Sequence, residues 1–158
     1  MESYRNNMIN VDEYIFTKRA DPVPYSYRLS YKLGMICLIL SACSRGGCSV
    51  VKLHLIAMGI SSDRGVESLK KLADGISEKY TLIRFDPTIT RTVSYAIADT
   101  MIYQQANGHL KLTKKGKDYV DLIKQDRELL QREKDILNDI GNKITEEKIR
   151  CIKESWGM

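Results

Sequence analysis

Apolar residues recur every three or four positions between residues 28 and 43, a spacing that places them on one face of a helix. They are Leu29, Leu33, Ile36, Cys37, Leu40 and Cys43. The Gly46-Gly47 pair then interrupts the helical pattern. A second helix is predicted from Ser49, whose side chain can cap the first turn, to a stop at Gly59.

A third helix is predicted to follow Ser61 or Ser62 as its cap and to stop at Gly75. Its inward-facing residues are Val66, Leu69 and Leu72. Three consecutive helices joined by tight turns indicate a helix-turn-helix core.

The pattern changes after Gly75, where residues 80–85 are rich in β-branched and aromatic side chains. This composition predicts a strand that ends at Asp86-Pro87. Asp86 or Thr88 can cap the next helix, because proline is tolerated in a first turn. The apolar face of that helix comprises Ile89, Val93, Ala96, Ile97 and Met101.

Within residues 101–112, apolar and polar residues alternate in two short runs, one on each side of Asn107-Gly108. Asn-Gly between two such runs is a strong hairpin signal. Thr113 can cap a closing helix over residues 114–120, in which Gly116 permits close packing. A helix, a two-stranded wing and a Leu-Thr-x-x-Gly segment recur in this order in winged-helix domains. The hairpin is therefore interpreted as a wing.

Apolar pairs recur every seven residues after Tyr119, which predicts one continuous helical stripe that needs a partner helix. The pairs are Leu122-Ile123, Leu129-Leu130 and Ile136-Leu137. Gly141-Asn142 ends this helix, and Thr145 begins another that presents Ile149, Ile152 and Trp156. Either the last helix folds back on the stripe as an antiparallel hairpin, or the stripe and Trp156 bind a second copy or a larger subunit.

These elements predict a mainly α (α+β) fold, a winged helix-turn-helix domain with a long C-terminal helical extension. Residues 1–27 are expected to form an extended arm, because Pro22 and Pro24 disfavour helix before them. Residues 28–125 would form the winged-helix domain, and residues 126–158 the helical hairpin or interaction helices.

The net charge of +5 is concentrated in the middle of the chain. Residues 28–125 hold 15 Lys or Arg against eight Asp or Glu, whereas each flank has a net charge of −1. A basic module between balanced flanks suits a polyanion such as double-stranded DNA. The candidate nucleic-acid-binding residues are Arg64, Lys70 and Lys71 on the third helix, Arg91 on the helix before the wing, and Lys111, Lys114 and Lys115 on the wing side.

Either of these two helices could enter the major groove. Neither carries the cluster of Arg, Asn and Gln that reads base edges, so sequence-specific recognition is not favoured.

The sequence contains no motif typical of nucleotide binding, acyl transfer or metalloprotease chemistry, and His54 and His109 stand alone. We therefore expect a non-enzymatic protein without a cofactor or metal. The four cysteines are interpreted as reduced thiols. The alternative, a zinc site at Cys43, Cys48 and His54, lacks a fourth ligand.

The longest apolar run covers only residues 33–43, whereas a membrane span needs about 20 residues. The first residues lack the cationic and apolar regions of a secretory signal. We therefore expect a cytoplasmic protein with no membrane partner.

Several short segments occur in an order that resembles a known family. They are Val51-Lys52-Leu53-His54-Leu55-Ile56, Arg84-Phe85-Asp86-Pro87, Met101-Ile102-Tyr103 and Leu112-Thr113-Lys114-Lys115-Gly116. This order is similar to that of the middle component of bacterial ABC three-component, Lamassu-like anti-phage systems, over about residues 28–125. The resemblance implies a winged-helix adaptor that joins an SMC-like, Rad50-related ATPase to an effector subunit. The alternative is a dimeric winged-helix transcription regulator.

Overall fold

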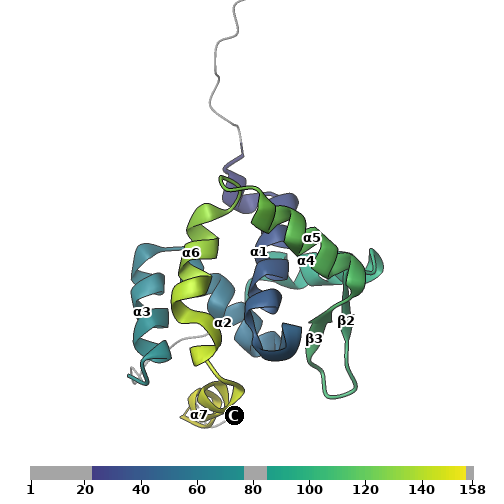
Figure 1. Cartoon of the computed structure of the whole chain (residues 1–158). Coiled ribbons are helices and arrows are strands. Elements are labelled where there is room, and N and C mark those ends of the chain that lie inside the picture. Colours follow the sequence, from purple (N-terminus) through teal and green to yellow (C-terminus); the bar gives the residue numbers. More distant parts are fainter. Residues whose placement is uncertain (1–22, 77–84, 156–158) are drawn as a thin grey trace, which may run out of the picture.

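The structure is a computed structural model that describes residues 23–76 and 85–155. This part of the chain is mainly helical, with one small antiparallel sheet (Figure 1). Its α-helices are α1 (Leu29–Ala42), α2 (Val50–Ile60), α3 (Asp63–Ala73), α4 (Pro87–Ala98), α5 (Lys114–Gln125), α6 (Gln131–Ile140) and α7 (Glu146–Ser155). Short 3-10 helices are η1 (Tyr25–Tyr27), η2 (Ser44–Gly46) and η3 (Gly141–Lys143). None of the helices in these two ranges is both long and apolar enough to cross a membrane.

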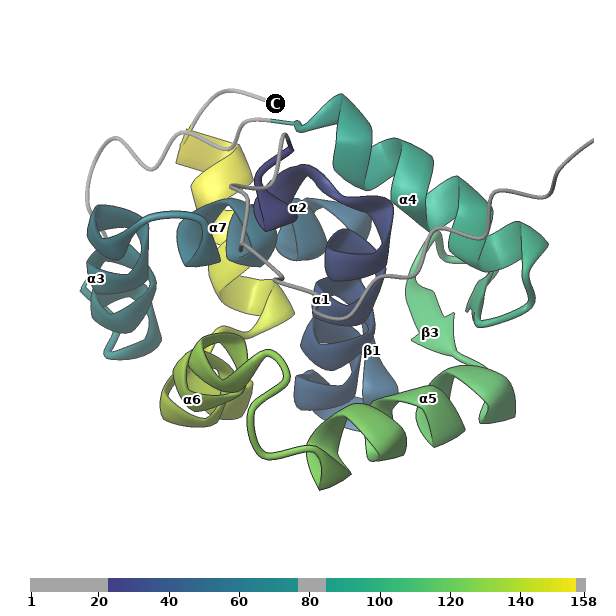
Figure 2. The same ribbon diagram turned by 90° about the horizontal axis from the view of Figure 1, so that it is seen from above.

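Helix α1 is the centre of the fold, with other helices packed around it (Figure 2). Every residue from Gly34 to Leu40 is buried, so the helix is covered on all sides and not on the single face that its spacing predicted. The reason is that Met35, Leu38 and Ile39 fill the remaining faces with further apolar side chains. A helix that is apolar all round is typical of a core position.

Side-chain caps begin four of the helices where the sequence predicted them. Ser49 accepts a hydrogen bond from the Lys52 amide, and Thr113 accepts one from the Gly116 amide. Ser62 and Asp86 cap α3 and α4 in the same manner. Each cap satisfies an amide that the helix itself leaves unpaired.

The predicted stop of α2 at Gly59 is wrong, because the helix continues to Ile60. Gly59 instead allows α3 to approach α2 closely. A Cβ atom at Gly59 would lie 2.4 Å from the Leu69 side chain, and one at Gly65 would lie 2.3 Å from the Gly59 carbonyl oxygen. The two glycines thus set the α2–α3 packing distance.

The sheet contains β1 (Gly47–Cys48), β2 (Ile102–Gln104) and β3 (Leu110–Leu112) in the spatial order β1-β3-β2. The predicted hairpin is confirmed: Ile102 pairs with Leu112, and Gly108 has a left-handed φ of 80° in the connecting turn. Strand β1 was not predicted, because Gly46-Gly47 indicated only a break. Gly47 pairs with Lys111, and a Cβ there would lie 2.4 Å from the Leu110 carbonyl oxygen.

The predicted continuous helix after Tyr119 is wrong. Helix α5 ends at Gln125, and the Asp126 carboxylate accepts hydrogen bonds from the amides of Glu128 and Leu129. Leu130 then adopts a left-handed φ of 52° before α6 begins. The seven-residue spacing of the apolar pairs therefore continues across a turn that separates two helices.

The two C-terminal helices do not form an antiparallel hairpin. Helix α6 packs against α1 and α3, whereas α7 packs against α2. In Figure 1, α6 stands upright and α7 is seen nearly along its axis. Ile149 and Ile152 of α7 are buried in the same core as α1.

Two predicted segments fall mainly outside the described residues. In the predicted strand over residues 80–85, only Phe85 is described, and it lies in no strand. In the predicted extended arm over residues 1–27, residues 25–27 form η1.

Candidate functional site

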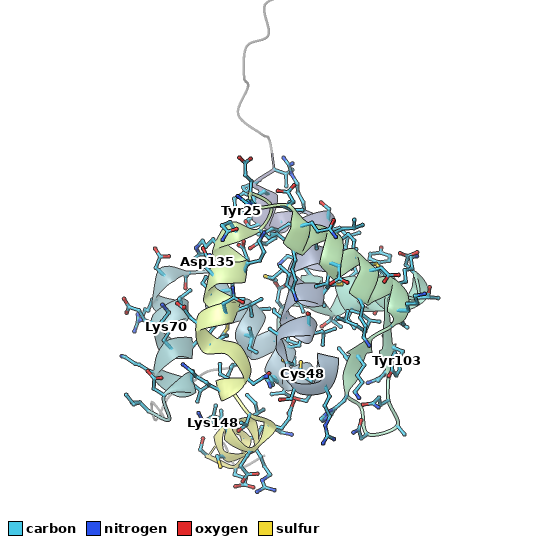
Figure 3. The ribbon with its side chains drawn as sticks, in the orientation of Figure 1. Tyr25, Cys48, Lys70, Tyr103, Asp135 and Lys148 are labelled. Atoms are coloured by element: carbon cyan, nitrogen blue, oxygen red, sulfur yellow. The ribbon has the colours of Figure 1, made fainter. Side chains whose placement is uncertain are left out.

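The candidate nucleic-acid-binding residues lie on two separate parts of the molecule. Arg64, Lys70 and Lys71 are on α3, and the other four are on α4, β3 and α5. Figures 1 and 2 both place α3 on the opposite side of the molecule from the β2–β3 hairpin, with α1 and α2 between them. Lys70 and Tyr103 accordingly lie on opposite edges of Figure 3. One nucleic acid contact surface therefore cannot include both groups.

The α3 group takes part in contacts within the chain. The Lys70 ammonium lies 2.9 Å from the Asp139 carboxylate of α6. This hydrogen bond lowers the pKa of Asp139. Arg132 of α6 similarly donates to Asp63 at 3.1 Å and to the Ile60 carbonyl oxygen at 2.8 Å. These contacts hold α3 against α6, and exposed pairs of this kind contribute little stability individually.

Helix α4 lies beside the hairpin and presents a polar surface there. Its inner face buries Ile89, Thr92 and Ala96, and the Thr92 hydroxyl donates to the Thr88 carbonyl oxygen at 2.7 Å. The exposed residues on its outer face include Thr90, Arg91, Ser94 and Tyr95. This helix therefore offers one cation with hydroxyl groups around it.

The cations near α4 differ in their local pairing. Lys115 donates to the carbonyl oxygen and the carboxylate of Asp99, at 2.9 Å and 2.8 Å, so its charge is balanced at the end of α4. Lys114 is exposed, and Lys111 is half-buried over Gly47. Of the predicted wing-side lysines, Lys111 and Lys114 are thus better placed than Lys115 to meet a phosphate.

Sequence reasoning missed three residues of this surface. Tyr103 is exposed and pairs across the hairpin with Lys111. Arg45, also exposed, precedes β1 by two residues, and β1 pairs with β3 at Lys111. Tyr95 is exposed on α4. Arg45 could be assigned to this surface only once β1 was known. The exposed Tyr95 and Tyr103 give no distinct signal in the sequence. We call Arg45, Arg91, Lys111, Lys114, Tyr95 and Tyr103 the wing surface, defined as these exposed or half-buried residues of the hairpin and of the elements next to it.

The candidate partner-binding residues differ in how far they are buried. Ile123, Ile136 and Leu137 are buried in the core of their own chain, so the expectation that they bind a partner is wrong. Leu130 is half-buried and packs against that core. Leu122 and Leu129 are 64% and 48% exposed. Trp156 lies outside the described residues.

Leu129 belongs to an exposed apolar area at one end of the molecule. It lies in the turn between α5 and α6, next to η1 at the top of Figure 1. Tyr25, Tyr27 and Leu29 are also largely exposed there, at 60%, 71% and 47%. We call these four residues the apolar end surface.

A cavity of about 510 Å³ opens within this end and is lined by both Tyr25 and Leu129. Glu133, which is only 4% exposed, lines it too and accepts a hydrogen bond of 2.8 Å from the Tyr31 hydroxyl. Burial and this hydrogen bond raise the pKa of Tyr31. The centroids of the Tyr25 and Tyr31 rings are 5.1 Å apart, and the rings pack edge to face, an arrangement that aromatic pairs prefer.

His54 is buried beside the start of α4. Its Nδ1 accepts a hydrogen bond from the Asp86 amide at 3.3 Å, and Nε2 lies 3.4 Å from the Thr90 hydroxyl. Burial lowers the pKa of His54, and the Asp86 carboxylate opposes part of this shift. For Asp86 itself, hydrogen bonds from Thr88 and Lys32 outweigh burial and hold its pKa at about 2.

Cys43 and Cys48 are buried, free thiols whose protonation is linked. The interaction of the two thiols lowers the pKa of Cys43 and raises that of Cys48. The alternative zinc site gains no support, because both nitrogens of His54 face α4. In the described ranges, no three metal-ligating side chains come together.

No protein-family model, curated protein or solved structure matches the chain. Its function therefore has to be inferred from the two surfaces and the fold that holds them.

Proposed function

We propose that the chain is a cytoplasmic winged-helix adaptor that binds a protein at its apolar end surface and nucleic acid at its wing surface, without catalysing a reaction. The order of elements supports the domain type. Winged-helix domains run helix, strand, helix, helix and a two-stranded wing, and α1, β1, α2, α4, β2 and β3 follow this order. The sheet order β1-β3-β2 also agrees, with α3 as an insertion.

Under this proposal α4, and not α3, is the helix that faces nucleic acid, because α4 packs against β2 of the wing. Its outer face has a single guanidinium, that of Arg91, so few base edges can be read. The cations of the wing surface suit phosphates, and its tyrosines suit sugars and exposed bases. We therefore propose contact with DNA that is largely independent of sequence.

The observation that carries the adaptor proposal is the apolar end surface. Two tyrosines and two leucines are each about half exposed or more, whereas most large apolar residues in the described part of the chain are buried. Exposed aromatic and apolar clusters mark protein interfaces. Because this surface is separate from the wing surface, one chain can hold a protein and a nucleic acid at once.

The resemblance to the middle component of Lamassu-like systems supplies the proposed partners, an SMC-like ATPase and an effector subunit. The test is co-expression with tagged products of the adjoining genes, among which the proposal expects an SMC-like ATPase. We expect the two chains to co-purify. Leu129→Glu and Tyr27→Ala should each reduce the amount recovered, because they put charge into, or remove area from, the apolar end surface.

Leu122→Glu is the matched control, since it places the same charge at another exposed leucine, on α5. Equal recovery of the ATPase with all three variants would remove the apolar end surface as its binding site. If the wild-type chain recovers no ATPase, the adaptor proposal falls.

The alternative, a dimeric transcription regulator, has less support. The residues expected to pair two copies include Ile123, Ile136 and Leu137, which are buried within one chain. A homodimer in sedimentation experiments, together with selective binding to one DNA sequence, would favour the regulator over the adaptor.

A further inference from the structure

The cavity at the apolar end combines aromatic rings with a buried acid. Tyr25, Tyr31 and Tyr119 all line it, and so does Glu133. The hydroxyl of Tyr31 donates to only one oxygen of that carboxylate. An ionised carboxylate can accept about four hydrogen bonds, so Glu133 retains capacity for a further donor.

The two arginines that border the cavity are engaged elsewhere. Arg132 donates from both terminal nitrogens, to the Ile60 carbonyl oxygen at 2.8 Å and to Asp63 at 3.1 Å. Arg28 donates to the Val23 carbonyl oxygen at 3.3 Å, at the outer rim. Each of these hydrogen bonds goes to a part of the chain other than Glu133.

We propose that this cavity receives an arginine side chain of the protein partner, with its guanidinium stacked against the tyrosine rings and paired with Glu133. The guanidinium is planar, stacks on aromatic faces and donates in a fixed fork to carboxylates. An apolar side chain would leave the carboxylate desolvated without a new partner, which is unfavourable. A lysine would supply charge but not the stacking plane.

The inference deepens the proposed function and rests on it, because it assigns the chemistry of one contact within the protein-binding surface. Leu129, which lines the cavity, and the exposed Tyr27 and Leu29 would cover the apolar remainder of the partner segment. The buried acid would supply the specificity of the contact, since a mismatch there leaves a charge unpaired.

The test uses the full chain and a probe that needs no knowledge of the partner. N-acetyl-argininamide is titrated while the amide and tyrosine ring resonances are followed by NMR. We expect saturable shifts, in the millimolar range of concentration, at Tyr31 and around Glu133. N-acetyl-citrullinamide has the same shape without the charge, and it should bind at least several-fold more weakly. Blocked lysine should fall between the two.

Variants then assign the contacts. Glu133→Gln should weaken binding of the arginine probe about tenfold, the reduction expected when a charged hydrogen bond is removed. Tyr25→Ala should weaken it too, and Leu122→Ala, exposed on α5 and outside the cavity lining, should not. Circular dichroism checks that each variant is folded, and the comparison of Tyr25→Ala with Leu122→Ala decides between the outcomes if Glu133→Gln unfolds.

Equal binding of the arginine and citrulline probes, or no saturable shift, would overturn the inference even if the ATPase co-purifies. Conversely, selective arginine binding that depends on Tyr25 would support the site even if no ATPase is recovered. Failure of the inference and failure of the adaptor proposal are therefore distinguishable.

Discussion

Gly116 controls how closely α5 approaches the start of the hairpin. A Cβ atom there would lie 2.2 Å from the Met101 carbonyl oxygen, a backbone atom that cannot move aside easily. Gly116→Ala adds helix propensity worth about 1 kcal/mol, but overpacking costs roughly 1–3 kcal/mol. We expect the steric cost to dominate, so the free energy of unfolding in urea should fall. Lys117→Ala, exposed on the same helix, is the control, and a more stable Gly116 variant would contradict the packing.

His54 should make stability depend on pH. Its pKa is lowered in the folded chain, so the unfolded chain binds the proton more readily. Stability is then fully present above the unfolded pKa of about 6.5 and declines as the pH falls below it. Urea unfolding at a series of pH values should show this decline. In His54→Asn, whose amide oxygen can replace Nδ1 as acceptor for the Asp86 amide, the decline should be smaller. An equal decline in both chains would assign it to another group.

The four cysteines should differ sharply in reactivity. Cys37, Cys43 and Cys48 are buried, whereas Cys151 is exposed on α7. Burial also raises the pKa of Cys37 to about 12, which removes its reactive thiolate near neutral pH. Native alkylation followed by mass spectrometry should modify Cys151 alone, and denaturant should release the other three. Rapid native labelling of Cys151→Ser would show that the core around α1 and β1 opens.

At the scale of elements, the parts that could be predicted from sequence are those specified locally. The capping residues Ser49, Asp86 and Thr113 act within their own first turn, and Asn107-Gly108 forms its turn with adjacent residues. Strand β1 was missed because two residues carry no periodicity and its partner, β3, lies some 60 positions away. Both named surfaces were missed for a similar reason, since each joins residues that lie far apart in the sequence, such as Tyr25 and Leu129.

The α5–α6 turn shows why a regular spacing can mislead. Leu129 and Leu130 keep the seven-residue interval, but Asp126 captures two amides that a helix would have used. Aspartate favours such local hydrogen bonds over the helix interior. Gly34 of α1 then leaves room for the Leu130 side chain, since a Cβ there would lie 2.8 Å from it. The outcome depends on a tertiary contact that spacing cannot reveal.

Lys148 joins three elements at the other end of the molecule (Figure 3). Its ammonium donates to the Leu72 and Ala73 carbonyl oxygens at the end of α3, at 3.0 Å and 2.8 Å, and to that of Lys143 at 2.9 Å. Lys148→Met should lower the free energy of unfolding by about 2–3 kcal/mol, since it removes all three hydrogen bonds. Hydrogen exchange should increase in α3 and α7. Lys153→Met, exposed on the same helix, should change neither, and if both variants behave alike the ammonium contributes no net stability.

For the whole molecule, the position of α3 determines whether the basic side chains can contact one nucleic acid together. Helix α3 lies against α6, on the far side of α1 from the wing, so the basic excess of residues 28–125 is divided between two sides. Neither side alone is strongly basic. This division favours weak, salt-sensitive contact with nucleic acid over tight binding, and it leaves the apolar end surface free for a protein.

A salt titration can separate the two basic groups. Replacing Arg91, Lys111 and Lys114 by alanine removes three positive charges from the wing surface, and replacing Arg64, Lys70 and Lys71 removes three from α3. The two triple variants have the same net charge, so any difference between them reflects position. In fluorescence anisotropy with random duplex DNA, the wing variant should bind more weakly. The slope of log affinity against log salt should flatten by about 0.9 for each phosphate that the variant no longer neutralises.

The α3 variant should keep the wild-type slope if α4 and the wing face the nucleic acid. The reverse result would transfer the contact to α3 and would contradict the proposal that α4 and the hairpin face nucleic acid. Equal changes in both variants would mean that only net charge matters, as in non-specific attraction. Because α1 and α2 separate the two groups, a single duplex held in one orientation cannot contact both, and the salt slope therefore identifies the face that it uses.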